Sequence, residues 1–150
     1  MNAEAMGEEL NELLGSATRG MLQYVGDSTP YLTPHTFAIW TGIQAVGAAV
    51  AQQGRILTDL LERLDLPVRP ASFDMNVARY PFTSIESLLP LLVDEAQRRV
   101  DINERAAALA ADHDPLRRQL ASMLDQNRAH LESLRSARDE LAPDPVNALE

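Results

Sequence analysis

The stretch DPLRRQLASMLDQNRAHLESLRSARDEL, residues 114–141, contains the periodicity that decides the fold class. Its apolar residues are spaced alternately three and four positions apart, as in the buried seam of a helix packed against other helices. They are Leu116, Leu120, Met123, Leu134, Ala137 and Leu141. The two positions in the middle of this seam are polar, Asn127 and His130, and they share one helix face because they are three residues apart. We expect a long helix of a helical bundle, with a polar pair at mid-length.

The composition favours a single all-α domain. The chain has 150 residues and is 45% apolar, which is enough for one domain with a buried core. Aromatic residues make up only 5%, and alanine and leucine dominate, which suits helix-on-helix packing better than a β-sandwich. The net charge is −9 and no dense basic patch is present. Neither nucleic acid nor a membrane is therefore expected as a partner.

Three further features bear on the compartment. Cysteine is absent, which excludes disulfides, thiolate metal sites and cysteine nucleophiles and is compatible with a reducing compartment. The start, MNAEAMGEEL, is acidic and has no apolar core, unlike a secretory signal. The most apolar run, residues 37–51, is shorter than the ~20 residues of a membrane span. We therefore expect a cytoplasmic protein.

Three amphipathic segments precede the last helix. We expect the four helices to cover residues 8–25, 34–64, 84–111 and 115–141. Gly47 and Gly54 lie on the buried stripe of the second helix, where each costs about 1 kcal/mol relative to alanine. Another backbone should therefore come close to the second helix at these positions. Residues 1–7 and 142–150 are expected to be flexible ends.

The segment between the second and third helices, residues 65–82, has no helical period and contains three prolines. Fully extended, it reaches at most ~60 Å, whereas a helix of about 28 residues is only ~42 Å long. This segment, which we call the strap, is therefore long enough to run the full length of the bundle. Four long helices with two short connections and one long middle connection match one known topology. We predict a ferritin-like antiparallel four-helix bundle with a long crossover between helices 2 and 3.

The chain resembles the ferritin-like superfamily of the rubrerythrin and bacterioferritin type over almost its whole length, about residues 9–141. The resemblance rests on the helix order, the mid-chain crossover and the local sequence of helices two and four, such as residues 53–64 running into Pro67. It implies a site for two iron or manganese ions between the helices. In such proteins one carboxylate comes from each of two helices and a Glu-x-x-His pair from each of the other two.

Most positions that match these ligands are substituted. The substituted positions are Ala17 in the first helix, Val50 and Gln53 in the second and Asn127 in the fourth. The third-helix carboxylate falls at Glu95 or at Ala96, and the fourth-helix imidazole at His130. Two hard cations need several carboxylates to offset their charge and to fill their coordination positions. We therefore expect neither a working di-metal centre nor another cofactor.

The remaining polar residues allow two interpretations each. Glu95 and Arg99 are four residues apart, so an intrahelical ion pair is available. If they face the seam, Arg99 fills the space of a metal ion and neutralises Glu95; otherwise both are solvated. Asn127 and His130 are either buried polar residues that hydrogen-bond to each other or to a facing helix, or ligands of a single metal ion or small molecule.

The sequence thus favours a non-catalytic bundle that acts through self-association or an unidentified protein partner. We expect a homodimer formed through the first two helices, because the flank with Ile39 and Val46, which we expect to be exposed, has few polar residues. One alternative is a metal-binding oxidoreductase with an atypical iron or manganese site at Glu95 and His130, assisted by Asp94. The other is a small-molecule binder in the bundle interior or in a slot beneath the strap.

Overall fold

The structure, a computed structural model, describes residues 1–27, 30–70 and 84–141 and is helical without strands over these residues. Its long helices are α1 (Ala3–Arg19), α3 (Pro34–Arg63), α4 (Ile85–Leu109) and α5 (Asp114–Leu141), and the short α2 (Met21–Asp27) follows α1. The predicted all-α class is confirmed, and the last three predicted helices agree with α3, α4 and α5 within two residues. No helix among the described residues is both long and apolar enough to cross a membrane.

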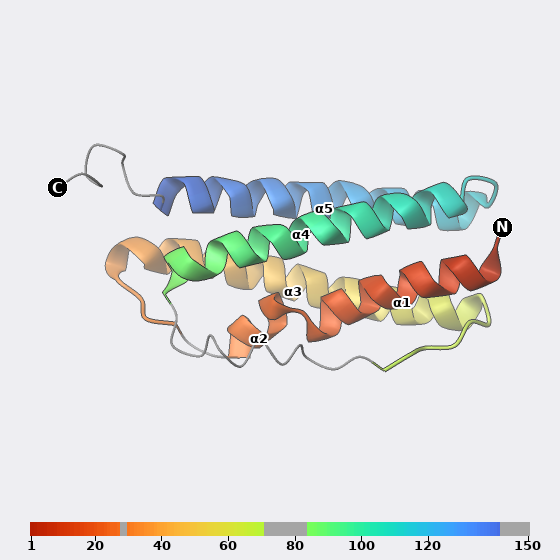
Figure 1. The fold of residues 1–150 in the computed structure, drawn as a ribbon, viewed down its shortest axis with the longest axis horizontal. Coiled ribbons are helices and arrows are strands. Elements are labelled where there is room, and N and C mark those ends of the chain that lie inside the picture. The colour runs from red at the N-terminus through yellow and green to blue at the C-terminus, as the bar shows by residue number, and fades with distance from the viewer. Residues whose placement is uncertain (28–29, 71–83, 142–150) are drawn as a thin grey trace.

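The four long helices lie side by side along one axis (Figure 1). α1 and α3 form one antiparallel pair and α4 and α5 the other, and α1 also packs against α4. α3 and α5 contact each other much less. Because α3 and α4 run in the same direction, the end of α3 and the start of α4 lie at opposite ends of the bundle (Figure 1).

Only the beginning of the strap belongs to the described residues. There the side chain of Asn11 on α1 donates to the carbonyl oxygen of Pro67 (2.9 Å) and accepts from the backbone N–H of Arg69 (2.7 Å). The rest of the strap and the predicted C-terminal tail, residues 142–150, lie outside the described residues. A cavity of about 460 Å³ lies beneath the described beginning of the strap, where Val68 and Pro70 face Leu14 and Thr58. Any slot beneath the rest of the strap lies outside the described residues.

Two hydrophobic clusters fill the interior, one toward each end of the bundle. The first contains Trp40, Val50, Leu89 and Leu134 among others, and the second contains Leu10, Leu61, Leu120 and Met123 among others. On α3 the boundary between the clusters falls at Gln53, and on α5 it falls at Asn127. Gln53 and Asn127 are both buried polar residues, and they lie at mid-length, where the sequence places the polar pair.

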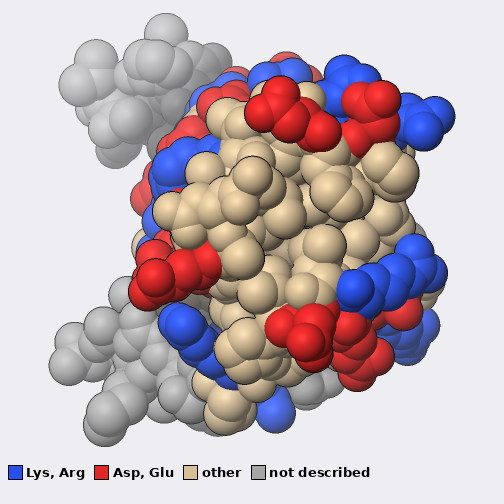
Figure 2. Space-filling view, turned by 90° about the vertical axis from the view of Figure 1, so that its right-hand side faces the viewer, with Lys and Arg blue, Asp and Glu red and all other residues tan. Residues whose placement is uncertain are grey.

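The end of the bundle at which α1 begins and α3 ends has charged side chains around its rim and an uncharged centre (Figure 2). A shallow cavity of about 190 Å³ opens between the end of α3 and the start of α5. Its lining includes Leu60, Leu64, Pro115 and Leu116. This end therefore closes the second cluster mainly with uncharged residues.

The prediction of a flexible start over residues 1–7 is wrong, because α1 begins at Ala3. Asn2 caps this helix, and its side-chain oxygen accepts a hydrogen bond from the backbone N–H of Ala5 (3.1 Å). Met6 is fully buried in the second cluster. A good N-cap and one buried apolar anchor thus extend the helix by five residues.

The single helix predicted over residues 8–25 is also wrong, because the chain leaves the helical conformation at Gly20 and divides into α1 and α2. The sequence also predicts that another backbone comes close to α3 at Gly47 and Gly54. At Gly54 the near atoms belong to side chains instead, and an added Cβ would lie 3.0 Å from the methyl carbon of Thr18. At Gly47 the nearest atom would be in the side chain of Leu22, at an ordinary 3.7 Å. Packing therefore requires glycine more clearly at Gly54 than at Gly47.

Candidate functional site

The positions at which the resemblance implies metal ligands are mostly buried, and most of them cannot bind a metal ion. Ala17 and Val50 are fully buried in the first hydrophobic cluster. Gln53 is buried as well, and its side-chain Nε2 donates to Oε1 of Gln126 on α5 (2.7 Å). Glu95 keeps a carboxylate, and it faces the interior with 7% of its surface exposed.

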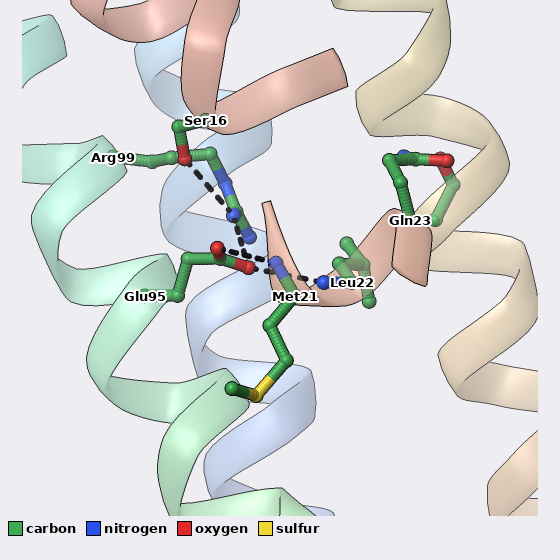
Figure 3. A network of polar contacts seen from close by, with 7 residues as sticks. Ser16, Met21, Leu22, Gln23, Glu95 and Arg99 are labelled. Carbon is green, nitrogen blue, oxygen red and sulfur yellow. Dashed lines mark hydrogen bonds and ion pairs between the residues drawn. The ribbon is translucent and has the colours of Figure 1, made fainter. Parts of the chain in front are cut away.

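The carboxylate of Glu95 reaches from α4 to the break between α1 and α2 (Figure 3). Its Oε1 accepts the backbone N–H of Met21 (2.8 Å) and its Oε2 accepts that of Leu22 (3.2 Å). These are the first two N–H groups of α2, and such groups have no partner within their own helix. Glu95 thus caps α2 from a distant helix, in the role that a local Asp or Ser usually plays. α2 is also fixed to α3, because Gln23 donates to the carbonyl oxygen of Gly47 (2.8 Å).

Gly20 lets the Glu95 carboxylate come close to the backbone. Its φ of −78° and ψ of 170° are available to any residue, so the conformation itself does not require glycine. An added Cβ, however, would collide with the carbonyl oxygen of Ser16 and with Oε1 of Glu95. The break in the helix, the missing side chain and the distant carboxylate therefore form one arrangement.

Arg99 lies one turn beyond Glu95 on α4 and completes the site (Figure 3). Its Nη1 is 3.3 Å from Oε2 of Glu95 and also donates to the hydroxyl oxygen of Ser16 (3.5 Å). Only 1% of Arg99 is exposed. Burial lowers the pKa of Arg99 from its ordinary value, and the neighbouring Glu95 carboxylate opposes that shift. Of the two interpretations of this pair, the structure has the buried ion pair rather than two solvated side chains.

Asn127, one of the two polar residues of the seam, bonds to the facing helix α4 and not to His130. Its Nδ2 donates to Oδ1 of Asn103 (3.0 Å), and Nδ2 of Asn103 donates to the carbonyl oxygen of Leu120 (3.1 Å). Asn103 is fully buried and was missed as a site residue in the sequence. A signal for it exists, because Asn103 occupies the apolar stripe of α4 three residues after Val100.

Three buried polar atoms of this region have no hydrogen-bond partner among the described residues. They are Nη2 of Arg99, Oδ1 of Asn127 and Nδ1 of His130. Arg99 and Asn103 are one turn apart on α4, Asn127 and His130 are one turn apart on α5, and the bond between the two asparagines joins the helices. The three atoms include a donor, the guanidinium nitrogen of Arg99, and an acceptor, the amide oxygen of Asn127.

His130 should titrate below the ordinary histidine pKa of about 6.5. Burial lowers its pKa first, and the positive charge of Arg99 lowers it further. The unfolded chain then takes up a proton more readily than the folded chain. We expect the free energy of unfolding to decrease as the pH falls below about 6.5 and to level off below the folded pKa.

An NMR titration of the His130 ring measures this pKa directly, and denaturation at a series of pH values measures its effect on stability. The difference in stability between the native chain and a His130→Gln variant isolates the contribution of this residue. A ring that titrates at or above about 6.5 would contradict the expectation.

The atypical metal site suggested by the sequence is not assembled as expected. Asp94 and Glu95 line one cavity of about 270 Å³ together with Gly20 and Arg98, but His130 does not belong to its lining. Among the residues that the structure describes, no three carboxylate or imidazole side chains gather closely enough to hold a metal ion. The carboxylate and imidazole that remain both have the Arg99 guanidinium as a neighbour, which repels a cation.

Comparison with known proteins does not add to this site. No family model matches the chain, and no curated protein or solved structure is significantly similar to it. What the arrangement can do chemically therefore follows from its own residues. The Glu95 carboxylate is bonded by three donors, one of them Arg99, and the amides of Asn103 and Asn127 are bonded to each other. These contacts join the helices at the middle of the bundle. None of these groups is an activated nucleophile.

Proposed function

We propose that this protein is a ferritin-like bundle in which an internal ion pair and amide hydrogen bonds replace the di-metal centre. Its helix order and the common direction of α3 and α4 support the ferritin-like assignment. In this proposal the protein acts through contact with other proteins, as a homodimer or with another partner, and not through catalysis. The observation that carries the proposal is the buried pair of Glu95 and Arg99.

The charge at the centre of the bundle supports the loss of the metal site. A di-metal centre brings at least four positive charges, which its relatives offset with several carboxylates. Here one carboxylate remains, and Arg99 already neutralises it. Two backbone N–H groups occupy the same carboxylate oxygens. A metal ion would have to displace these donors and would then lie beside a buried guanidinium.

Metal analysis of the purified protein tests the proposal. The protein is incubated with Fe²⁺ or Mn²⁺ and the excess metal is removed. We then expect inductively coupled plasma mass spectrometry to find far less than one metal ion per chain. A ferritin-like protein with an intact di-iron site, carried through the same steps, is the positive control. One or two ions per chain that are lost in a His130→Ala variant would refute the proposal in favour of the atypical oxidoreductase.

A second candidate function is the binding of a small polar molecule in the interior. It is favoured by the three unpartnered atoms of Arg99, Asn127 and His130. Native mass spectrometry, compared with the denatured mass of the chain, tests it. A ligand that is released on unfolding and is missing from an Asn127→Leu variant would support this function, whereas equal native and denatured masses would count against it.

A further inference from the structure

We propose that the exposed face of α3 is the surface through which two copies of this chain form an antiparallel, twofold-symmetric dimer. This inference rests on the proposed function and names its partner. The α3 face consists of Phe37, Ala38, Thr41, Gly42, Gln44, Ala45, Ala48 and Gln52, all of which are exposed.

The α3 face differs from the other helix surfaces in its lack of charge. From Pro34 to Gly54 the chain contains no Asp, Glu, Lys or Arg, although 23% of the whole chain is charged. The other long helices expose charged residues along their length. Examples are Glu4, Glu8, Glu12 and Arg19 on α1, Asp94, Arg98, Asp101 and Glu104 on α4, and Arg117, Asp125, Arg128 and Glu132 on α5.

The missing charge favours a second copy as the partner. Two chains of net charge −9 repel each other, so they associate most easily through faces without charge. A strongly basic partner would instead require acidic residues, which the α3 face does not have. The α3 face of a second copy carries no charge, so it is not repelled, and it needs no acidic residues opposite it. In a twofold dimer both copies use the same face.

The shape of the surface also suits a helix–helix contact. Ala38, Gly42, Ala45, Ala49 and Gln52 are spaced four and three apart, as in the seam of two packed helices. Small residues in such a seam allow the two backbones to approach closely.

A shallow groove lies on each side of the α3 face. One, of about 220 Å³, lies between α2 and α3 and is lined by Gln23, Gly26 and Gln44 among others. The other, of about 190 Å³, lies between α3 and α5 and includes Ile39 and Val46. Ile39 is half-buried and Val46 is buried, so the flank that the sequence suggested as exposed forms the wall of this groove. The α3 face is therefore a ridge between two grooves, and it can pack against the same face of a second copy.

An interface of ordinary size sets how wide the contact must be. The uncharged part of α3, about 20 residues, is about 30 Å long. A stable interface buries about 800 Å² on each partner, so this one must be about 25 Å wide. That width corresponds to α3 and the adjoining sides of two neighbouring helices. The two neighbouring helices are α2 and α5, which line the far sides of the two grooves.

The antiparallel arrangement follows from the ends of the α3 face. Phe37 is large and 60% exposed at the start of the face, whereas the residues after Ala45 are mostly small. With the twofold axis at Ala45, each Phe37 lies near the second copy's Gln52 and not against a second Phe37. Antiparallel helix dipoles also attract each other, whereas parallel dipoles repel.

Light scattering after size-exclusion chromatography tests the dimer. We expect about twice the chain mass of 16.5 kDa for the native protein. An Ala45→Glu variant brings two carboxylates together at the axis, and we expect dimerisation at least about 100-fold weaker. The control is Ala121→Glu, which adds the same charge to an exposed position of α5 and should leave the dimer intact. A native protein that is monomeric at every concentration, or a dimer that Ala45→Glu does not weaken, would overturn the proposal.

Single cysteines test the direction of the two helices, because the natural chain has none. Under mild oxidation Ala45→Cys should form a disulfide-linked dimer by itself. Ala38→Cys and Gln52→Cys should cross-link to each other when mixed and much less to themselves. An Ala121→Cys control should stay monomeric on a denaturing gel. Efficient self-linking of Ala38→Cys would overturn the antiparallel arrangement.

The α3 dimer and the loss of the di-metal centre are tested by different measurements, so one proposal can be refuted without the other. The oligomeric state decides the α3 interface, and the metal content of the same samples decides whether the di-metal centre has been lost. Circular dichroism of each variant confirms that the bundle is folded, since Ala38, Ala45 and Ala121 are all exposed.

Discussion

Replacing Arg99 by alanine is expected to lower the free energy of unfolding by about 3–5 kcal/mol. The substitution leaves Glu95 as a buried carboxylate without its charge partner, 3.3 Å from the position of the lost guanidinium nitrogen. It also removes packing, since Arg99 is among the largest fully buried side chains of the protein. Denaturation in urea, followed by circular dichroism, measures the change.

The neighbouring Arg98 provides the control, because it is exposed on the same helix. An Arg98→Ala variant should change the free energy of unfolding by no more than about 0.5 kcal/mol. Equal effects of the two substitutions would mean that Arg99 is solvated and that the interior contains no ion pair.

The second large effect is expected for Gly20→Ala, which should destabilise the fold by about 3 kcal/mol. The methyl group would collide with the carbonyl oxygen of Ser16 and with the carboxylate of Glu95, and overpacking of this kind typically costs about 1–3 kcal/mol. If Glu95 moves away, the hydrogen bonds from Met21 and Leu22 are weakened, and bonds to a charged group contribute about 1.5–3 kcal/mol each.

Gly26→Ala is the matched control within α2. An added Cβ at Gly26 has no neighbour within 4 Å, so the higher helix propensity of alanine should stabilise the protein by up to about 1 kcal/mol. The two glycine variants are thus expected to change stability in opposite directions. A Gly20→Ala variant as stable as the native chain would show that Glu95 does not depend on the missing side chain.

The all-α class could be predicted because the helices have strong local signals, such as the three–four spacing of residues 114–141 and the Thr33 cap of α3. The break at Gly20 could not be predicted in the same way. Its cap is Glu95, which is 74 residues from Met21 in the sequence, and no local pattern contains that information. The wrong start predicted for α1 has a different cause. Its N-cap, Asn2, is a local signal next to the helix and could have been recognised in the sequence.

The candidate site could be predicted in part. The spacing of Glu95 and Arg99 indicates an ion pair, but spacing alone does not decide whether the pair is buried, since most charged residues are exposed. The bond between Asn103 and Asn127 depends on the register of α4 against α5, which the sequence of one helix does not contain. The influence of Arg99 on His130 depends on the same register.

A double-mutant cycle on Glu95→Ala and Arg99→Ala tests most directly whether the two side chains form one neutral, buried unit. The free energies of unfolding of the native chain, both single variants and the double variant give the coupling energy. We predict a coupling of at least about 2 kcal/mol, because either charge alone is left unpaired whereas their joint removal is not. Effects that add within about 0.5 kcal/mol would contradict this account, because Glu95 would then be available to a metal ion.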